Sequence, residues 1–278
     1  MPVLLTRSIP DFPIGNRPLR DHQAAFGPGW SFHPNAWISP SDLATLEEAG
    51  KGALVDAEGT PLAWKGGEPD TDVLVPAQES FVIVHSWDFL RANELYVGSF
   101  ETDWDALASA KSDGRIHPLA ILDGQVHVGP GTRILPGVYI EGNVIIGANC
   151  KIGPNCYIRG NTSIGDHCHV GNAVEVKNSI LLSGTNVGHL SYVGDSVLGE
   201  KVNLGAGTIT SNLRHDGRNH RTLVGRKVVD TGRRKFGTVI GDGVHTGINT
   251  SIYPARKIGP GATTLPGEIV KRDLPSTN

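Results

Sequence analysis

The apolar residues in the second half of the chain recur every six positions. Steps of six from residue 128 meet only Ile, Leu or Val at ten successive positions: Val128, Ile134, Ile140, Ile146, Ile152, Ile158, Ile164, Val170, Val176 and Leu182. After a slip of one residue the phase resumes at Val187, and after another at Leu198. A last stretch runs from Ile240 to Ile258. Because a helix repeats every 3.6 residues and a strand every two, this period indicates a short strand followed by a turn.

Three such units closed into a triangular coil place each aliphatic side chain over the one 18 residues later. The stacked side chains form a continuous apolar column, and each strand pairs with strands in the coils above and below. Gly often follows the aliphatic residue, where the chain turns a corner. The pattern therefore predicts a parallel β-helix over about residues 115–272.

One short motif competes with this interpretation. Residues 129–133, Gly-Pro-Gly-Thr-Arg, match the phosphate-binding G-x-G-T-R loop of sugar nucleotidyltransferases. Such a loop should follow the first strand near the N-terminus and open a helix, whereas this one lies inside the six-residue register. We therefore interpret it as a corner of the repeat.

The first 114 residues show no period of six. Their pattern predicts a short helix over residues 41–50, with a Ser/Asp start and a Gly stop. Short strands are predicted at residues 54–55, 73–75 and 81–84, and one helical segment over residues 87–110. The sequence thus predicts two domains, a small α/β domain over residues 1–114 and a β-helix over residues 115–278. The expected fold class is mainly β.

Composition adds several exclusions. Gly makes up 36 of 278 residues, about 13% against a usual figure of about 7%, which disfavours a helix-dominated fold. The net charge of −3 (25 basic against 28 acidic residues) argues against a general nucleic-acid binder. The sequence contains no run of 18 apolar residues, so it predicts no membrane span, and no secretory signal is recognised. We therefore expect a cytoplasmic protein with neither nucleic-acid nor membrane partners.

The three cysteines are Cys150, Cys156 and Cys168. Their odd number and the absence of a C-x-x-C pair fit a reducing compartment. Each follows a repeat aliphatic by four residues, a position that Thr132 and Val138 also occupy. We interpret the thiols as small packing side chains and expect no metal in the β-helix, since stacked thiols alone do not form a tetrahedral site.

The most specific stretch is VGHLSYVGDSVLGEKVNLGAGTITSN, residues 187–212. Together with HVGNAVEVK at residues 169–177, it resembles the acetyltransferase half of the bifunctional glucosamine-1-phosphate acetyltransferase/N-acetylglucosamine-1-phosphate uridyltransferase family. The resemblance covers about residues 115–270. It implies that the parallel β-helix is left-handed and that the protein is a homotrimer. It also implies an activity, the N-acetylation of glucosamine 1-phosphate or galactosamine 1-phosphate with acetyl-CoA as co-substrate.

The resemblance also implies roles for particular residues. His189 matches the general base that takes a proton from the sugar amine, and Glu175 matches an acidic neighbour that orients or polarises it. The positions matching the sugar-phosphate pocket are Arg159, Lys177, Tyr192 and Asn203. Ala206 matches the residue whose N–H faces the acetyl oxygen, and Asn212 matches another position on the acetyl-CoA side.

The chain departs from this family in two places. Residues 211–235 hold eight Lys/Arg and two Asp, a local charge of 8 − 2 = +6. We expect this basic insert to bind anions, with Arg218 or Arg221 replacing a Lys that bacterial members have there. In the N-terminal region, residues 12–23 and 84–96 only faintly resemble a nucleotidyltransferase domain. They indicate a shortened, degenerate remnant of it.

Three other functions remain open from the sequence. A shortened N-terminal domain also permits a non-catalytic sugar-nucleotide-binding or regulatory protein, or another relative of the sugar-1-phosphate nucleotidyltransferases. A third possibility is a metal-dependent β-helix enzyme resembling the γ-type carbonic anhydrases, because His215 and His220 are five residues apart with His189 upstream. Those two histidines lie in the basic insert and outside the six-residue frame, which disfavours this interpretation.

Overall fold

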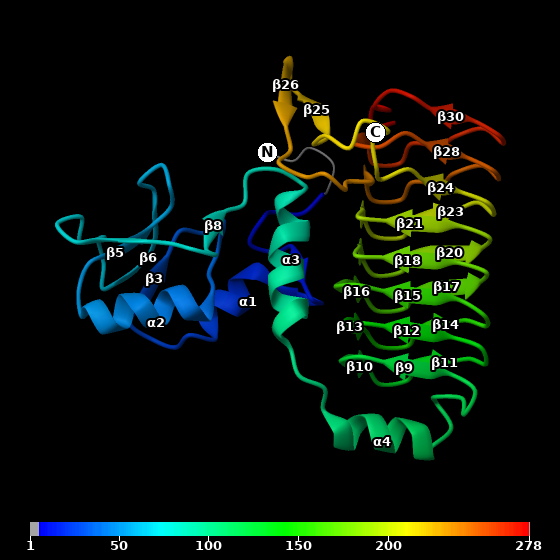
Figure 1. Cartoon of the computed structure of the whole chain (residues 1–278), viewed down its shortest axis with the longest axis horizontal. Helices are drawn as coiled ribbons and strands as arrows, with labels where there is room; N and C mark the ends of the chain where they lie inside the picture. The colour runs from blue at the N-terminus through cyan, green and yellow to red at the C-terminus, as the bar shows by residue number, and fades with distance from the viewer. Residues whose placement is uncertain (1–5, 278) are drawn as a thin grey trace.

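The computed structural model describes residues 6–277, and most of this part is a parallel β-helix. Figure 1 shows its coils stacked as a column, with the smaller N-terminal region beside it. The strands form three flat faces, called here the first, second and third. All strand pairs within these faces are parallel, as in Ile140↔Ile158 and Ile158↔Val176.

The first face has seven strands: β10 (Val126–Val128), β13 (Val144–Ile146), β16 (Thr162–Ile164), β19 (Ile180–Leu181), β22 (Val197–Leu198), β27 (Thr238–Ile240) and β29 (Arg256–Ile258). The second has five: β11 (Arg133–Ile134), β14 (Lys151–Ile152), β17 (His169–Asn172), β20 (Asn186–His189) and β23 (Asn203–Leu204). The third has eight: β9 (Ile121–Asp123), β12 (Tyr139–Glu141), β15 (Tyr157–Arg159), β18 (Glu175–Lys177), β21 (Tyr192–Gly194), β24 (Ile209–Thr210), β28 (Ser251–Ile252) and β30 (Ile269–Val270).

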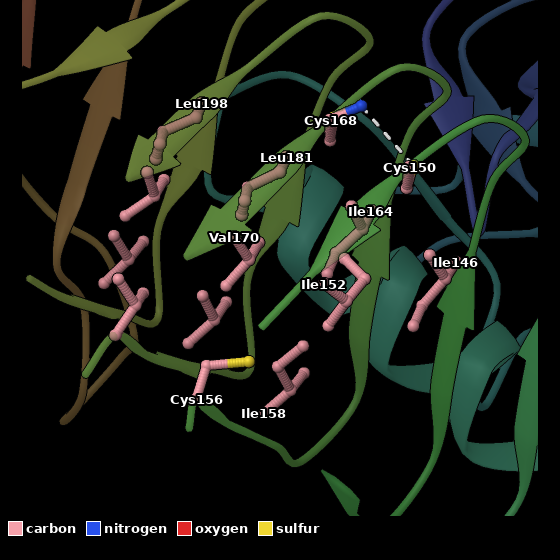
Figure 2. Packing of buried hydrophobic residues seen from close by; sticks show 14 of the residues in the cluster. Ile146, Cys150, Ile152, Cys156, Ile158, Ile164, Cys168, Val170, Leu181 and Leu198 are labelled. Carbon is pink, nitrogen blue, oxygen red and sulfur yellow. Dashed lines mark hydrogen bonds between the residues drawn. The ribbon is translucent and has the colours of Figure 1, made fainter. Parts of the chain in front are cut away.

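The apolar column lies inside the coils, as the period of six predicts, with one correction. The prediction that Leu182 belongs to the inward column is wrong, because Leu181 takes that place and pairs with Ile164 below and with Leu198 above. Figure 2 shows Leu181 in line with these two side chains. The coil is one residue shorter than its predecessor here, so the aliphatic residue at 181 reaches the register. Leu182 is buried instead in a second apolar cluster, together with Trp87 of the N-terminal region.

The cysteines are free thiols buried in the column (Figure 2). The Cys168 N–H donates a hydrogen bond to Cys150 Sγ over 3.4 Å. Burial raises the pKa of Cys156 to about 12, so this thiol stays protonated at neutral pH. The three side chains therefore fill space in the core.

From residue 6 onward, the N-terminal region combines small sheets with four helices. The helices are α1 (Leu19–Ala24), α2 (Pro40–Ala49), α3 (Asp88–Ser99) and α4 (Trp104–Ser112). A four-stranded sheet has the order β3 (Trp30–Phe32), β6 (Pro61–Lys65), β5 (Ala53–Val55) and β7 (Leu74–Pro76). Two strand pairs complete it: β1 (Pro13–Ile14) with β2 (Arg17–Pro18), and β4 (Ala36–Trp37) with β8 (Phe81–Val82).

The single helical segment predicted over residues 87–110 was wrong, because the chain forms two helices there. α3 ends at Ser99, and the next residue, Phe100, has an extended backbone. Asp103 caps the start of α4 by accepting a hydrogen bond from the Ala106 N–H at 3.0 Å. In Figure 1, α3 runs beside the column and α4 covers its first coils. Leu107 and Ala110 of α4 belong to the apolar core of the β-helix.

The basic insert interrupts the stack between two coils of normal size. Leu198 pairs with Ile240, which is 240 − 198 = 42 residues later, whereas neighbouring coils differ by 17 or 18 residues. Part of the extra chain forms a hairpin of β25 (Arg221–Val224) and β26 (Lys227–Asp230). The G-x-G-T-R sequence links β10 to β11, which confirms that it is a corner of the repeat.

The predicted fold class is confirmed as mainly β, with a small α/β region followed by a parallel β-helix. Among the helices within residues 6–277, none has the length and apolar character needed to cross a lipid bilayer.

Candidate functional site

Polar side chains gather on the outer surface of the third face. Val176 and Val193 of β18 and β21 are fully buried, so their neighbours in each strand point outward. This alternation exposes Glu175 and Lys177 on β18 and Tyr192 on β21. Parallel register sets Glu175 beside Tyr192 and Lys177 beside Arg159. Four predicted site residues are thereby brought together.

A corner of the coil adds two more polar groups to this surface. The equivalent corner positions in successive coils are Gly142, Gly160, Asn178 and Asp195, all with positive φ. Asn and Asp tolerate this left-handed conformation better than other residues with a side chain. The upper coils can therefore replace glycine with side chains that hydrogen-bond beside the third face.

Asp195 is the centre of the resulting network. Its side chain is 3% exposed and accepts hydrogen bonds from Lys177 Nζ at 2.9 and 3.1 Å, with the shorter contact to Oδ2. Asn178 Nδ2 donates to Oδ1 at 2.9 Å, and Asn212 Nδ2 donates to Oδ2. A buried carboxylate with three donors is well compensated, so Lys177 is held in one position.

Tyr192 and Asn212 extend the network toward the next coil. Asn212 Nδ2 also lies 2.9 Å from the Tyr192 hydroxyl. Burial, and then the negative charges of Asp195 and Glu175, raise the pKa of Tyr192. The phenol is therefore neutral at pH 7 and can donate its proton in a hydrogen bond to a ligand.

Arg159 and Glu175 form an ion pair on the same face. Arg159 Nε and Nη2 lie 2.9 and 2.8 Å from Glu175 Oε1. Burial tends to lower the pKa of Arg159, but the hydrogen bond and charge of Glu175 outweigh it and the pKa is raised. Glu175 is thus engaged with Arg159. Among residues 6–277 no hydrogen bond joins it to the predicted base, His189.

Two residues from outside the β-helix strands complete the network. Glu94 of α3 accepts a hydrogen bond from Asn178 Nδ2 at 2.6 Å and forms an ion pair with Arg233, whose Nη1 lies 3.1 Å from Glu94 Oε2. Arg233 belongs to the end of the basic insert. We call Arg159, Glu175, Lys177, Asn178, Tyr192, Asp195, Asn212, Glu94 and Arg233 the third-face network.

His189 lies at the corner between the second and third faces. Its carbonyl accepts the Gly207 N–H at 3.1 Å, which stacks His189 next to Ala206 in the following coil. The imidazole is exposed and has no hydrogen-bond partner within the described part of the chain. The Ala206 N–H likewise donates no hydrogen bond to any of residues 6–277. A free imidazole and a free backbone N–H therefore occupy neighbouring coils at one corner.

Other predicted site residues lie away from the network. Asn203 is exposed on the second face, in the column between Asn186 and His245. Arg218 and Arg221 are exposed at the base of the insert's hairpin, without side-chain contacts to the network among residues 6–277.

The proposed histidine metal site finds no support in the geometry. Burial lowers the pKa of His220, and His220 Nε2 bonds to the Asn212 carbonyl at 2.9 Å. His215 is exposed. Within residues 6–277, no three His, Cys, Asp or Glu side chains converge as metal ligands would.

Four network residues were missed in the sequence. Asp195 stands in the GHLSYVGD motif, so the motif itself was a usable signal. Asn178 directly follows the matched HVGNAVEVK segment. Glu94 and Arg233 had no such signal, because their contact joins chain segments 139 residues apart.

The comparisons with known proteins cover the β-helix. The family model described as GMPPB C-terminal domain matches residues 140–260. A bifunctional sugar-1-phosphate nucleotidylyltransferase/acetyltransferase of Sulfurisphaera tokodaii is 50% identical over 102 residues, 37% of this chain and 25% of that protein. A bifunctional protein GlmU of Methanococcus aeolicus is 40% identical over 191 residues, 67% of this chain and 44% of that protein.

Similarity to solved structures is looser. A mutant of AntD, an N-acyltransferase from Bacillus cereus solved with dTDP and coenzyme A, is 18% identical, with a TM-score of 0.29 and coverage of 60% of this chain and 79% of that one. The chain spans less than half the length of the two curated relatives it matches. Over its C-terminal region, which contains the β-helix, the chain is homologous to the bifunctional sugar-1-phosphate nucleotidylyltransferase/acetyltransferases.

Proposed function

We propose that the protein is an N-acetyltransferase that moves the acetyl group of acetyl-CoA to the amine of an amino-sugar 1-phosphate. The observation that supports it most is the corner where His189 and Ala206 lie in neighbouring coils, with no hydrogen-bond partner among residues 6–277 for the His189 imidazole or the Ala206 N–H. Tyr192, a member of the third-face network, follows His189 by three residues. The homologous relatives include acetyltransferases by name.

His189 acts as the general base in this proposal. An amine must lose a proton to form a stable amide, and imidazole has an ordinary pKa close to the working pH. The exposed ring accepts that proton while the amine nitrogen attacks the thioester carbonyl. The nitrogen–carbon bond forms, the carbon–sulfur bond breaks, and coenzyme A leaves as a thiol after taking up a proton.

The Ala206 N–H stabilises the negative charge that develops on the acetyl oxygen. A preorganised backbone donor of this kind commonly contributes a factor of about 10²–10³ to the rate. The donor is useful because it gives up no acceptor among residues 6–277 when it binds the acetyl oxygen. Asn212, whose side chain contacts Tyr192 and Asp195, lies on the next turn and borders the same site.

The sugar phosphate binds over the third-face network. Within that network, three cations face three carboxylates: Arg159 with Glu175, Lys177 with Asp195, and Arg233 with Glu94. A charge-balanced surface attracts a phosphate dianion weakly. The basic insert, with its charge of +6, supplies the positive potential, and Arg218 and Arg221, exposed on the insert and away from the network, are proposed to attract the phosphate through that potential.

The remaining features of the proposal concern assembly. We propose a homotrimer and two domains divided near residue 114. Exposed apolar side chains near the His189 corner suit a subunit interface: Leu190 is 62% exposed and Ile248, in the coil above Ala206, is 53% exposed. Sedimentation equilibrium would measure a trimer mass, and a monomer would contradict this assembly.

Activity is tested by thiol release from acetyl-CoA with glucosamine 1-phosphate or galactosamine 1-phosphate. We expect steady release with at least one of them. N-Acetylglucosamine 1-phosphate is the matched control, because its nitrogen is already acylated and should give no release. Free glucosamine, which lacks the phosphate, should react much more slowly. Binding of a sugar nucleotide with no thiol release from any amino-sugar phosphate would instead favour a non-catalytic binding protein.

A further inference from the structure

The N-terminal region contains a cavity of about 500 Å³ that the proposed reaction does not use. It lies among α1, β4, the start of α2 and the end of α3. Figure 1 shows α1 between α2 and α3. None of its lining residues belongs to the third-face network. Ligand sites in proteins commonly have volumes of about 300–1,000 Å³, so this cavity is large enough for a small organic molecule.

Part of its wall is aromatic. His22 packs edge-on against Tyr96 at 4.4 Å and against Trp37 at 5.3 Å, measured between ring centroids. Burial lowers the pKa of His22, and its Nε2 bonds to the Ile14 carbonyl at 2.9 Å, so the ring is neutral and fixed at pH 7. Phe26 lines another part of the cavity. Such walls favour a planar ring, since aromatic rings pack well edge-on or offset.

Polar groups without full complements of partners also line the cavity. The Arg17 guanidinium donates to the Asp21 carbonyl and forms no ion pair with any of residues 6–277. The Tyr96 hydroxyl has no hydrogen-bond partner in the same part of the chain. Glu79 uses one carboxylate oxygen, Oε2, to accept from Ser39 at 2.7 Å and Ser41 at 3.3 Å, and Oε1 accepts no hydrogen bond from residues 6–277.

We propose that this cavity binds a small ring-bearing anion that also donates hydrogen bonds. Arg17 pairs with the carboxylate or phosphate of the ligand, because a planar guanidinium matches both groups. The ring packs against Tyr96 and Trp37, and Glu79 Oε1 accepts a proton donor on the ligand. The anionic group could belong to an aromatic amino acid or to a nucleoside monophosphate, and the two are distinguished experimentally.

Isothermal titration calorimetry of the full chain with L-tyrosine and with uridine 5′-monophosphate tests this proposal. Tyramine and uridine are the matched controls, since each lacks only the anionic group. We expect saturable binding of at least one anion, and binding of its matched control weaker by about tenfold or more. Saturation by tyrosine alone assigns a carboxylate ligand, and saturation by the nucleotide alone assigns a phosphate ligand.

Variants place the binding in the cavity. Arg17→Gln should weaken binding of the ligand about tenfold and leave unchanged the affinity for the matched control, which lacks the anionic group. Arg20→Gln is the control variant, because Arg20 lies only three residues away in α1 but pairs with Asp11 and does not line the cavity. Saturation by neither anion, or equal affinity in the wild type and Arg17→Gln, would overturn the proposal.

Discussion

Glu94 of helix α3 and Arg233 of the basic insert form an ion pair over the edge of the third face, with Arg233 Nη1 3.1 Å from Glu94 Oε2. The pair is part-buried, and Glu94 also accepts a hydrogen bond from Asn178. Asn178 and Lys177 both donate hydrogen bonds to Asp195. The N-terminal region and the insert thus both reach the proposed substrate site. Neither segment belongs to the six-residue repeat.

Arg233→Gln should raise the KM for the sugar phosphate about five- to tenfold with little change in kcat, because Glu94 is left as an unpaired negative charge beside the site. The double variant Glu94→Gln/Arg233→Gln removes both charges and should recover most of the lost affinity. Steady-state kinetics measure both. Arg234→Gln is the matched control, an exposed neighbour without an ion pair among residues 6–277. Equal effects of Arg233→Gln and Arg234→Gln would refute this positioning role.

Asp195→Asn should destabilise the fold by about 3–5 kcal/mol, because Lys177 then loses the partner of a buried ion pair. Urea unfolding at pH 7 measures the change. Asp216→Asn is the control, since Asp216 pairs with Arg214 at the surface and the loss of an exposed pair changes stability little. A similar small effect of both substitutions would mean that Asp195 does not hold Lys177.

His189→Asn should lower kcat by a factor of about 10²–10⁴, the usual contribution of a general base. The urea midpoint should not change, because the exposed imidazole has no hydrogen-bond partner within residues 6–277. His215→Asn serves as the control, an exposed histidine in the basic insert, and should retain full activity. Unchanged kcat in His189→Asn would exclude the proposed base while leaving the fold and the network intact.

The period of six was enough to predict the coils, because each aliphatic residue must meet its equivalents above and below. It could not locate the shortened coil, since Leu181 and Leu182 are both leucine and both are buried. The choice between them depends on where the corner at Asn178 tightens. The position of that shortening is a property of the folded backbone, and the period of six in the sequence does not predict it.

The site was predictable where the motif was continuous and unpredictable where distant segments meet. Lys177 and Tyr192 are neighbours through strand register, which the repeat implies. Arg233 reaches the same surface only because the insert folds back onto α3. Arg218, an equally plausible cation in the sequence, remains in the exposed part of the insert. Composition alone does not distinguish these two arginines.

Gly171→Ala should destabilise the β-helix by about 1–3 kcal/mol, because an added Cβ would overlap the carbonyl oxygen of Gly188 in the next coil. Gly188→Ala is a closely matched control at the equivalent position one coil above. Its Cβ would meet nothing within 4 Å, so stability should stay within about 0.5 kcal/mol. Thermal or urea unfolding compares the two. Equal losses would contradict the predicted close approach of the coils at Gly171.

Stability should fall as pH falls from 7.5 to 5.5. Burial lowers the pKa of His22 and of His220 below the ordinary value of about 6.5 that each has in the unfolded chain. Below about pH 6.5 the unfolded chain therefore binds more protons than the folded one, and the free energy of unfolding decreases with decreasing pH. Urea unfolding at several pH values measures this slope. Replacing either histidine by Gln should flatten it, whereas His215→Gln, in an exposed position, should leave it unchanged. If neither His22→Gln nor His220→Gln reduces the slope, the loss of stability at low pH comes from other groups.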